Sequence, residues 1–253
     1  MNFLFHSRTW DANPLNERSD GIHTDTEAHN LGFQGAFVPG VTLYEHVVSE
    51  LLNQGVDWLN SGRASYRFRL PVYNNERVTF SINAEDRSFQ VTGSDGKGPR
   101  MFGTIGLEEK TLDIDELVPM NPSNEKLGKS EQIGSVLQIE EYFDVNVYSK
   151  PNNSNFPNRI DDKVVVPVGK WVNPVDLITT HFDESTTIHR TGKICHHSPL
   201  YAGETMIRKG IITNLTEHNG HQIVHFSVVQ ITTTGRKLVT IEHESIYRLA
   251  NVN

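Results

Sequence analysis

The stretch GIHTDTEAHNLGFQGAFVPG, from Gly21 to Gly40, and the VTLYEHVVSELL that follows it, from Val41 to Leu52, decide the fold. In the second part, apolar residues at positions 41, 44, 48, 51 and 52 have helical spacing. Pro39-Gly40 marks the start of this segment, and Asn53-Gln54-Gly55 marks its end. The pattern therefore predicts a long helix with one apolar face.

The first part predicts a short helix that leads into a candidate binding site. Thr24 and Glu27 have the spacing of a capping box, and Gly32 fits the C-terminal stop. The first amides of the long helix have no partner within it, and the helix dipole attracts negative charge there. We therefore expect an oxyanion or substrate-binding site at Gly40, Val41 and Tyr44. For Tyr44, one turn into the helix, a place in the core is the main alternative.

A repeat at an offset of 128 residues suggests two copies of one domain. Pro71-x-Tyr73-x-x-Glu76 recurs as Pro199-x-Tyr201-x-x-Glu204. The same offset carries Val38-Pro39-Gly40 onto Val166-Pro167-Val168-Gly169, with a slip of one residue between the glycines.

Short runs of β-branched and aromatic residues separated by turn signals predict strands in both halves. In the first half these are residues 65–70, 77–83, 88–92 and 100–107, and in the second 187–197, 205–215, 221–232 and 236–249. Residues 136–147 predict an edge strand or the opening strand of the second half. Residues 173–182, with Pro174 in the first turn, predict its helix. We expect an α+β protein with domains at 1–115 and 130–253.

Composition narrows the class of protein. A length of 253 residues allows two domains of ordinary size. A net charge of −8 argues against a nucleic-acid partner, and the sequence has no apolar run long enough to span a membrane. The N-terminus lacks the apolar core of a signal peptide, and Cys195 is the one cysteine. We therefore expect a cytoplasmic protein.

His23-x-Asp25, Gly32-Phe33-x-Gly35 and Val38-Pro39-Gly40 before an apolar helix resemble the MaoC-like hotdog proteins, which include the (R)-specific enoyl-CoA hydratases. Residues 67–73 extend the likeness. The resemblance implies a tandem, double hotdog, in which each half is a long helix wrapped by a curved antiparallel sheet. It also implies a small acyl-thioester substrate (acyl-CoA or acyl-carrier), no cofactor and a possible homodimer. Among the late histidines, His218, His221 and His225 have no clear further ligand beside them, so we expect no metal.

The resemblance also implies a hydratase or dehydratase in which an aspartate and a histidine position water and move protons. With His23 as that histidine, the aspartate position falls on Arg18, and the nearest carboxylates are Asp20 and Asp25. Asp11-x-Asn13-Pro14 fits the motif in another register, but the histidine is then Asn16. We take His23, Asp20 and Asp25 as the candidate catalytic residues.

Each of these residues also has a structural reading. His23 could bond a backbone group in its loop, Asp25 could be a helix N-cap, and Asp20 could be a solvated loop residue. Two other functions also stay open. A hotdog thioesterase would activate water with Glu45 or Glu50, and a non-catalytic homologue would bind acyl groups without turnover.

Overall fold

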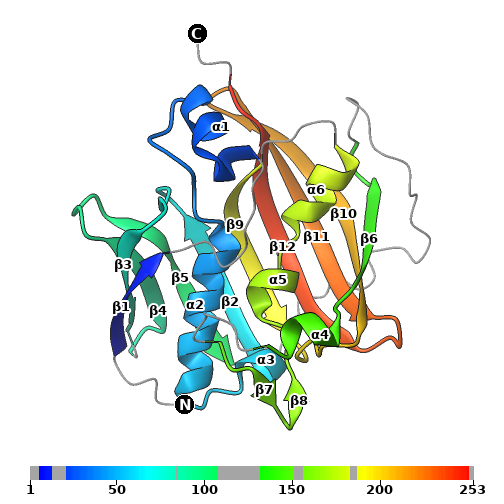
Figure 1. The fold of residues 1–253 in the computed structure, drawn as a ribbon. Helices are drawn as coiled ribbons and strands as arrows, with labels where there is room; N and C mark the ends of the chain where they lie inside the picture. Colours follow the sequence, from blue (N-terminus) through cyan, green and yellow to red (C-terminus); the bar gives the residue numbers. More distant parts are fainter. Residues whose placement is uncertain are drawn as a thin grey trace.

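A computed structural model describes residues 6–12, 21–83, 85–107, 132–150, 156–182 and 187–250. Its main feature is a ten-stranded antiparallel sheet (Figure 1). The strands of the first half are β1 (His6–Ala12), β2 (Gly62–Phe68), β3 (Glu76–Ile82), β4 (Ser88–Gly93) and β5 (Pro99–Leu107). Those of the second half are β6 (Val136–Tyr142), β9 (Ile188–His196), β10 (Thr205–His218), β11 (His221–Thr232) and β12 (Lys237–Arg248). The two-residue strands β7 (Arg159–Ile160) and β8 (Lys163–Val164) pair separately.

The two halves of the sheet follow the same strand order. From one edge the order is β1-β3-β4-β5-β2, and from the other edge it is β6-β10-β11-β12-β9. In each half the first strand lies at the edge, and the second lies at the centre, where β2 pairs with β9. Ser65 lies opposite Lys193 in this pair, and these residues are themselves 128 positions apart. The two halves are therefore related by a local twofold axis at this pair.

Backbone contacts repeat at the same offset and explain the Pro-x-Tyr-x-x-Glu repeat. The amide of Tyr73 donates to Glu76 Oε2 (3.1 Å), and the amide of Tyr201 donates to Glu204 Oε2 (2.9 Å). Each carboxylate also pairs with an arginine, Arg100 in the first half and Arg236 in the second. The repeated sequence therefore encodes one turn, stabilised in the same way, before the third strand of each half.

The slip of one residue, which would align Gly40 with Gly169, is wrong. Pro39 and Pro167 cap their helices with nearly the same backbone angles (φ −55° and −56°, ψ 136° and 137°). The amide of Val38 donates to Val72 O (2.7 Å), and the amide of Val166 donates to Leu200 O (2.9 Å), again 128 residues on. Val168, and not Gly169, therefore takes the place of Gly40.

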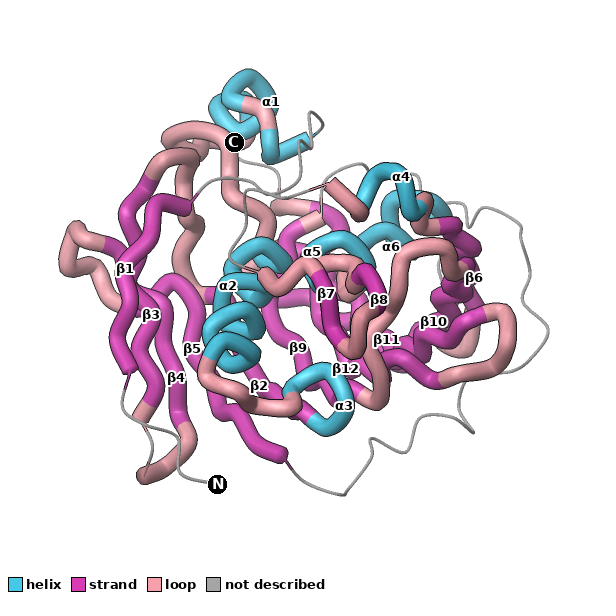
Figure 2. Tube along the Cα trace, turned by 60° about the horizontal axis from the view of Figure 1, so that its bottom comes forward, coloured by secondary structure: helices cyan, strands magenta, loops and turns pink. Residues whose placement is uncertain are grey.

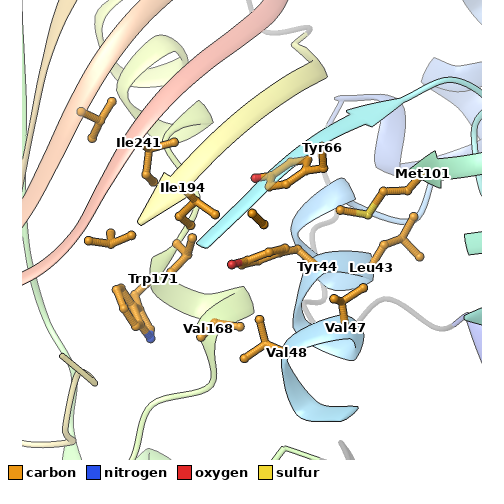
Figure 3. Close-up of a cluster of buried hydrophobic side chains, with 14 of the residues drawn as sticks. Leu43, Tyr44, Val47, Val48, Tyr66, Met101, Val168, Trp171, Ile194 and Ile241 are labelled. Carbon is orange, nitrogen blue, oxygen red and sulfur yellow. The ribbon is translucent and has the colours of Figure 1, made fainter. Parts of the chain in front are cut away.

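The helices lie on one face of the curved sheet, with α2 (Gly40–Asn53) against the first half (Figure 2). The apolar stripe of α2 is buried, so the predicted long helix is confirmed. Full burial of such a side chain contributes about 1.5–3 kcal/mol. The core continues from α2 into the second half, where Val168 and Trp171 meet Ile194 and Ile241 (Figure 3). The other helical segments of the first half are η1 (Gly21–His23), α1 (Asp25–Asn30) and α3 (Trp58–Ser61).

The second half does not contain the expected long helix. Its helical segment is divided into α5 (Val168–Trp171) and α6 (Val175–His181), after the short α4 (Val145–Tyr148). Pro174 is the N-cap of α6, so the helix predicted over residues 173–182, with Pro174 in its first turn, is confirmed. A proline has no amide to donate and disfavours helical backbone in the residue before it, which separates α6 from α5.

The strands predicted in both halves match β2 to β5 and β9 to β12. The strand predicted over residues 136–147 ends at Tyr142, because residues 145–148 form α4, and β6 is both an edge strand and the opening strand of its half. The edge strand β1 was not predicted. The proposed boundary between 115 and 130 lies outside the described residues. Among the described helices, none combines the length and apolar composition needed to cross a bilayer.

Candidate functional site

The segment from η1 to the start of α2 is held together by hydrogen bonds at Phe37. The amide of Phe37 donates to Ile22 O (2.9 Å), and Phe37 O accepts from Nδ1 of His23 (2.8 Å). Phe37 also forms a β-bridge with Tyr73. Two residues that are 14 positions apart in the sequence are thus fixed side by side, directly before the helix.

The hydrogen bond from His23 to Phe37 O fixes the tautomer of its ring. A carbonyl oxygen only accepts, so the bond to Phe37 O places the hydrogen of a neutral ring on Nδ1. Nε2 is then the basic nitrogen. The ring is half-buried and lies on the wall of a cavity. The backbone bond and a catalytic role are therefore compatible, because the bond orients the ring.

Asp25 was expected to be either a catalytic residue or a helix N-cap, and the structure places it differently. The N-cap of α1 is Thr24, whose side chain accepts from the amide of Glu27 (3.4 Å), and Asp25 is the first helical residue. Its Oδ1 accepts from the amide of Ala36 (2.8 Å) and fixes the loop that leads to α2. Asp25 is absent from the described cavity lining, so its assignment as a catalytic group is not supported. Asp20 and Arg18 lie outside the described residues.

A cavity of about 330 Å³ opens at the N-terminus of α2. The first half contributes His23, the start of α2 and the end of β2, and the second half contributes the segment before α6 and the start of β9. The walls are mainly apolar, and the polar groups are few, as is typical of small-molecule sites. The apolar residues are Ile22, Phe33, Phe37, Val38, Val41, Leu43, Phe68, Leu70, Val72, Val175, Ile188, Ile246 and Leu249.

Of the three residues predicted to bind substrate, Gly40 and Val41 line this cavity. They are the first two residues of α2, where amides lack a partner within the helix and the dipole favours negative charge. Gly40 is required by space as well. A Cβ atom there would lie 2.8 Å from the ring of Phe68.

Tyr44 does not reach the cavity and is a core residue. It is 0% exposed. Its hydroxyl is hydrogen bonded to His196 Nε2 (2.9 Å) and accepts from Trp58 Nε1 (3.2 Å). Burial raises the pKa of this hydroxyl well above its ordinary value. In Figure 3 the ring extends from α2 toward Ile194 and Trp171 of the second half.

The position equivalent to the cavity in the second half, at the start of α5, is filled by side chains from α2. Glu45 is buried, and its Oε2 accepts from the amide of Gly169 (2.8 Å). By the 128-residue offset, Gly169 corresponds to Val41, and Glu45 corresponds to Asn173, which lines the cavity of the first half. The two helix starts are thus equivalent in backbone, but one faces a cavity and the other holds an internal carboxylate.

The carboxylate of Glu45 therefore binds an internal amide and does not line the described cavity. Glu50 is also buried, and Gln54 Nε2 donates to its carboxylate (3.4 Å). Neither glutamate belongs to the described cavity lining. The two carboxylates expected for a thioesterase are thus directed elsewhere.

Sequence reasoning missed the polar residues that the second half adds to the cavity. They are Asn173, Thr187, His189, Arg190 and His221, and Arg69 of the first half also lies on its wall. Arg190 pairs with Glu244 (2.8 Å), and Arg69 is exposed. The strand pattern of residues 187–197 gave no sign that His189 differs from the other late histidines.

Two of these late histidines, His196 and His243, are buried in the core, and His189 is half-buried on the cavity wall. Burial lowers the pKa of His189 and of His196 to about 3, and for His196 the neighbouring His197 adds to the effect. Burial, followed by the effect of nearby His189, also lowers the pKa of His243 well below its ordinary value. All three rings are therefore neutral at pH 7. The described residues hold no group of three or more His, Cys, Asp or Glu side chains that could bind a metal ion.

Gly40→Ala is expected to lower the free energy of unfolding by about 1–3 kcal/mol, because overpacking of the Phe68 ring costs that much. Shortening the ring side chain in Gly40→Ala/Phe68→Leu should recover part of the loss. Gly106→Ala is a matched control, since its Cβ would meet only Arg87 at 3.9 Å. Urea unfolding measures all three variants. Equal stability of Gly40→Ala and Gly106→Ala would contradict the close contact.

No protein-family model and no curated protein matches the chain. Solved structures do. A structure from Chloroflexus aurantiacus described as a MaoC domain protein dehydratase has a TM-score of 0.61 at 11% identity, over 98% of this chain and 95% of that one. A Mycobacterium tuberculosis protein described as a double hotdog has a TM-score of 0.59 at 11% identity, over 96% of each chain.

A structure from Lactobacillus plantarum described as an oleoyl thioesterase has a TM-score of 0.52 at 10% identity, over 98% of each chain. Together these likenesses show the hotdog fold, in agreement with the resemblance of residues 21–52. Dehydratase and thioesterase names both occur among the neighbours, so the fold does not select the reaction.

Proposed function

We propose that this chain is a double-hotdog hydratase or dehydratase that adds water to a 2-enoyl thioester or removes it from a 3-hydroxyacyl thioester. The observation that carries the proposal is the position of His23 and the N-terminus of α2 on the wall of one cavity. The equivalent strand orders and the hydrogen bonds repeated at 128 residues support two hotdog domains in the chain.

The cavity suits an acyl thioester. Its apolar walls fit an acyl chain, and its helix start offers amides to the thioester oxygen, which becomes negative as an enolate forms. Arg69 and Arg190 are cations on the same wall and suit the phosphates of coenzyme A or of a carrier arm.

A single base can complete the reaction. The oxygen of a water molecule bonds to C3 of the enoyl group, and Nε2 of His23 takes one of its protons. The electrons of the double bond move to the thioester oxygen, near the amides of Gly40 and Val41. The imidazolium of His23 then returns the proton to C2, and the product is a 3-hydroxyacyl thioester. This is general acid–base catalysis with charge stabilisation at the oxygen.

The test is incubation of the full chain with a trans-2-enoyl-CoA, followed by absorbance of the conjugated thioester and by a thiol reagent. We expect loss of the enoyl signal, formation of 3-hydroxyacyl-CoA and no thiol release. Thiol release would instead identify a thioesterase. Binding without either change would identify the non-catalytic homologue.

A further inference from the structure

His189 is a cavity residue whose ring is held in place from two sides. It lies near the start of β9, on the cavity wall that also includes His23. Its ring is 4.8 Å from that of Phe68 and 4.0 Å from that of His243, measured between centroids. His243 is itself fixed by Ser245, whose Oγ is 2.6 Å from its Nε2. The orientation of the His189 ring is therefore set before any ligand enters.

The tautomer of His189 is set as well. Its Nε2 lies 3.2 Å from Thr191 O, and a carbonyl only accepts, so Nε2 carries the hydrogen. Nδ1 is then a hydrogen-bond acceptor. The oxygen of a thioester has no hydrogen to offer this nitrogen, but a water molecule or a hydroxyl group does.

This ring is suited to accept a hydrogen bond and unsuited to keep a proton. Its pKa is lowered to about 3 by burial. Tyr66 and His243, the titratable groups whose rings pack against it, bring no negative charge that would stabilise an imidazolium. His189 therefore has a different role from His23, which is the candidate proton carrier.

We propose that His189 Nδ1 holds the water molecule that is added, and afterwards holds the 3-hydroxyl group formed from it. This inference rests on the proposed function. It adds His189, from the second half of the chain, to His23 as a second group that contacts the water. As the water oxygen bonds to C3, one hydrogen passes to His23 and then to C2. The other hydrogen stays on the oxygen and points to His189 Nδ1, so atoms and charges balance.

The test compares the binding of (R)-3-hydroxybutyryl-CoA with that of butyryl-CoA to the full chain by titration calorimetry. A hydrogen bond between neutral groups is worth about a fivefold to tenfold difference in affinity. We expect this preference for the hydroxylated ligand in the wild type. In His189→Leu we expect both ligands to bind equally, because the acceptor is removed. His189→Asn should restore the preference, because Oδ1 of asparagine takes the place of Nδ1.

His225→Asn is the matched control. His225 lies on β11, where it contacts Thr216 and Glu244, and it is absent from the described lining of the cavity. The control should bind both ligands as the wild type does. Thermal unfolding of each variant separates loss of fold from loss of the contact.

A wild type without the preference, or a folded His189→Leu variant that keeps it, would overturn the role of His189. Neither result affects the proposed function, which is decided by turnover of the enoyl thioester. Failure of both ligands to bind would instead overturn the acyl-thioester site and the role of His189 with it. Because binding alone is measured, an inactive homologue can be tested in the same way.

Discussion

Replacing His23 with alanine is expected to lower kcat/KM for the hydration of a trans-2-enoyl-CoA by about 10²–10⁴-fold, the usual contribution of a positioned acid–base group. The loss should fall mainly on kcat, because the apolar walls and the helix start still bind the thioester. Stability should change little, since the ring is half-buried at the end of η1 and lies outside the core. Steady-state kinetics and thermal unfolding measure the two effects.

His29→Ala is the matched control for this prediction. His29 lies on α1, and its Nε2 is 3.0 Å from Gln34 O, so it also bonds a carbonyl of the same segment. It is exposed and is not among the described residues of the cavity wall. The control should keep the wild-type rate. Equal rates for His23→Ala and the wild type would exclude His23 as the proton carrier.

The second large effect is a loss of stability in mild acid. His189, His196 and His243 are neutral in the folded chain, whereas an unfolded histidine takes up a proton below pH 6.5. The unfolded state then binds more protons, so the free energy of unfolding falls as pH falls from 6.5 toward 3. Each ring contributes up to about 1.4 kcal/mol per pH unit in this window. Above pH 6.5 the contribution is complete and constant.

Urea unfolding at pH 7.0, 6.0 and 5.0 measures this dependence. His243→Gln should be less stable at pH 7. The slope of its unfolding free energy against pH should be smaller than that of the wild type by the equivalent of about one proton. His225→Asn changes a half-exposed ring, so its unfolding free energy should depend on pH as steeply as that of the wild type. Equal slopes for His243→Gln and the wild type would show that His243 is not a buried neutral ring.

The sequence was most informative where a pattern reports on local structure. Helical spacing of apolar residues from Val41 to Leu52 predicted α2, because such a stripe has one face to bury. The Pro-x-Tyr-x-x-Glu repeat predicted two copies of one domain. In the structure it forms the same turn in both halves, because the glutamate accepts from the amide of the tyrosine. The strands followed from their turn signals.

The site could be predicted only in part, because its polar groups come from distant segments. His23 and Gly40 were found, since both lie in one continuous motif. The role of Asp25 was missed because Ala36, whose amide it binds, comes close only when the loop folds back. His189 reaches the cavity through the pairing of β2 with β9, which a single sequence pattern does not encode.

The sequence pattern also did not predict how the two halves differ. The motif around Val168 and Gly169 looks much like that around Gly40, but Glu45 and Tyr44 fill its surroundings from α2. Pro174 lies between α5 and α6, so the second half has two short helices in place of one long helix. These contacts between the two halves decide which of the two equivalent helix starts faces a cavity.

The central claim is that the N-terminus of α2 binds the thioester, and a crystal structure with (R)-3-hydroxybutyryl-CoA tests it most directly. We predict the thioester oxygen within hydrogen-bond distance of the amide of Gly40 or Val41, with the acyl chain beside His23. A thioester bound away from α2, with the cavity at Gly40 unchanged, would contradict the account.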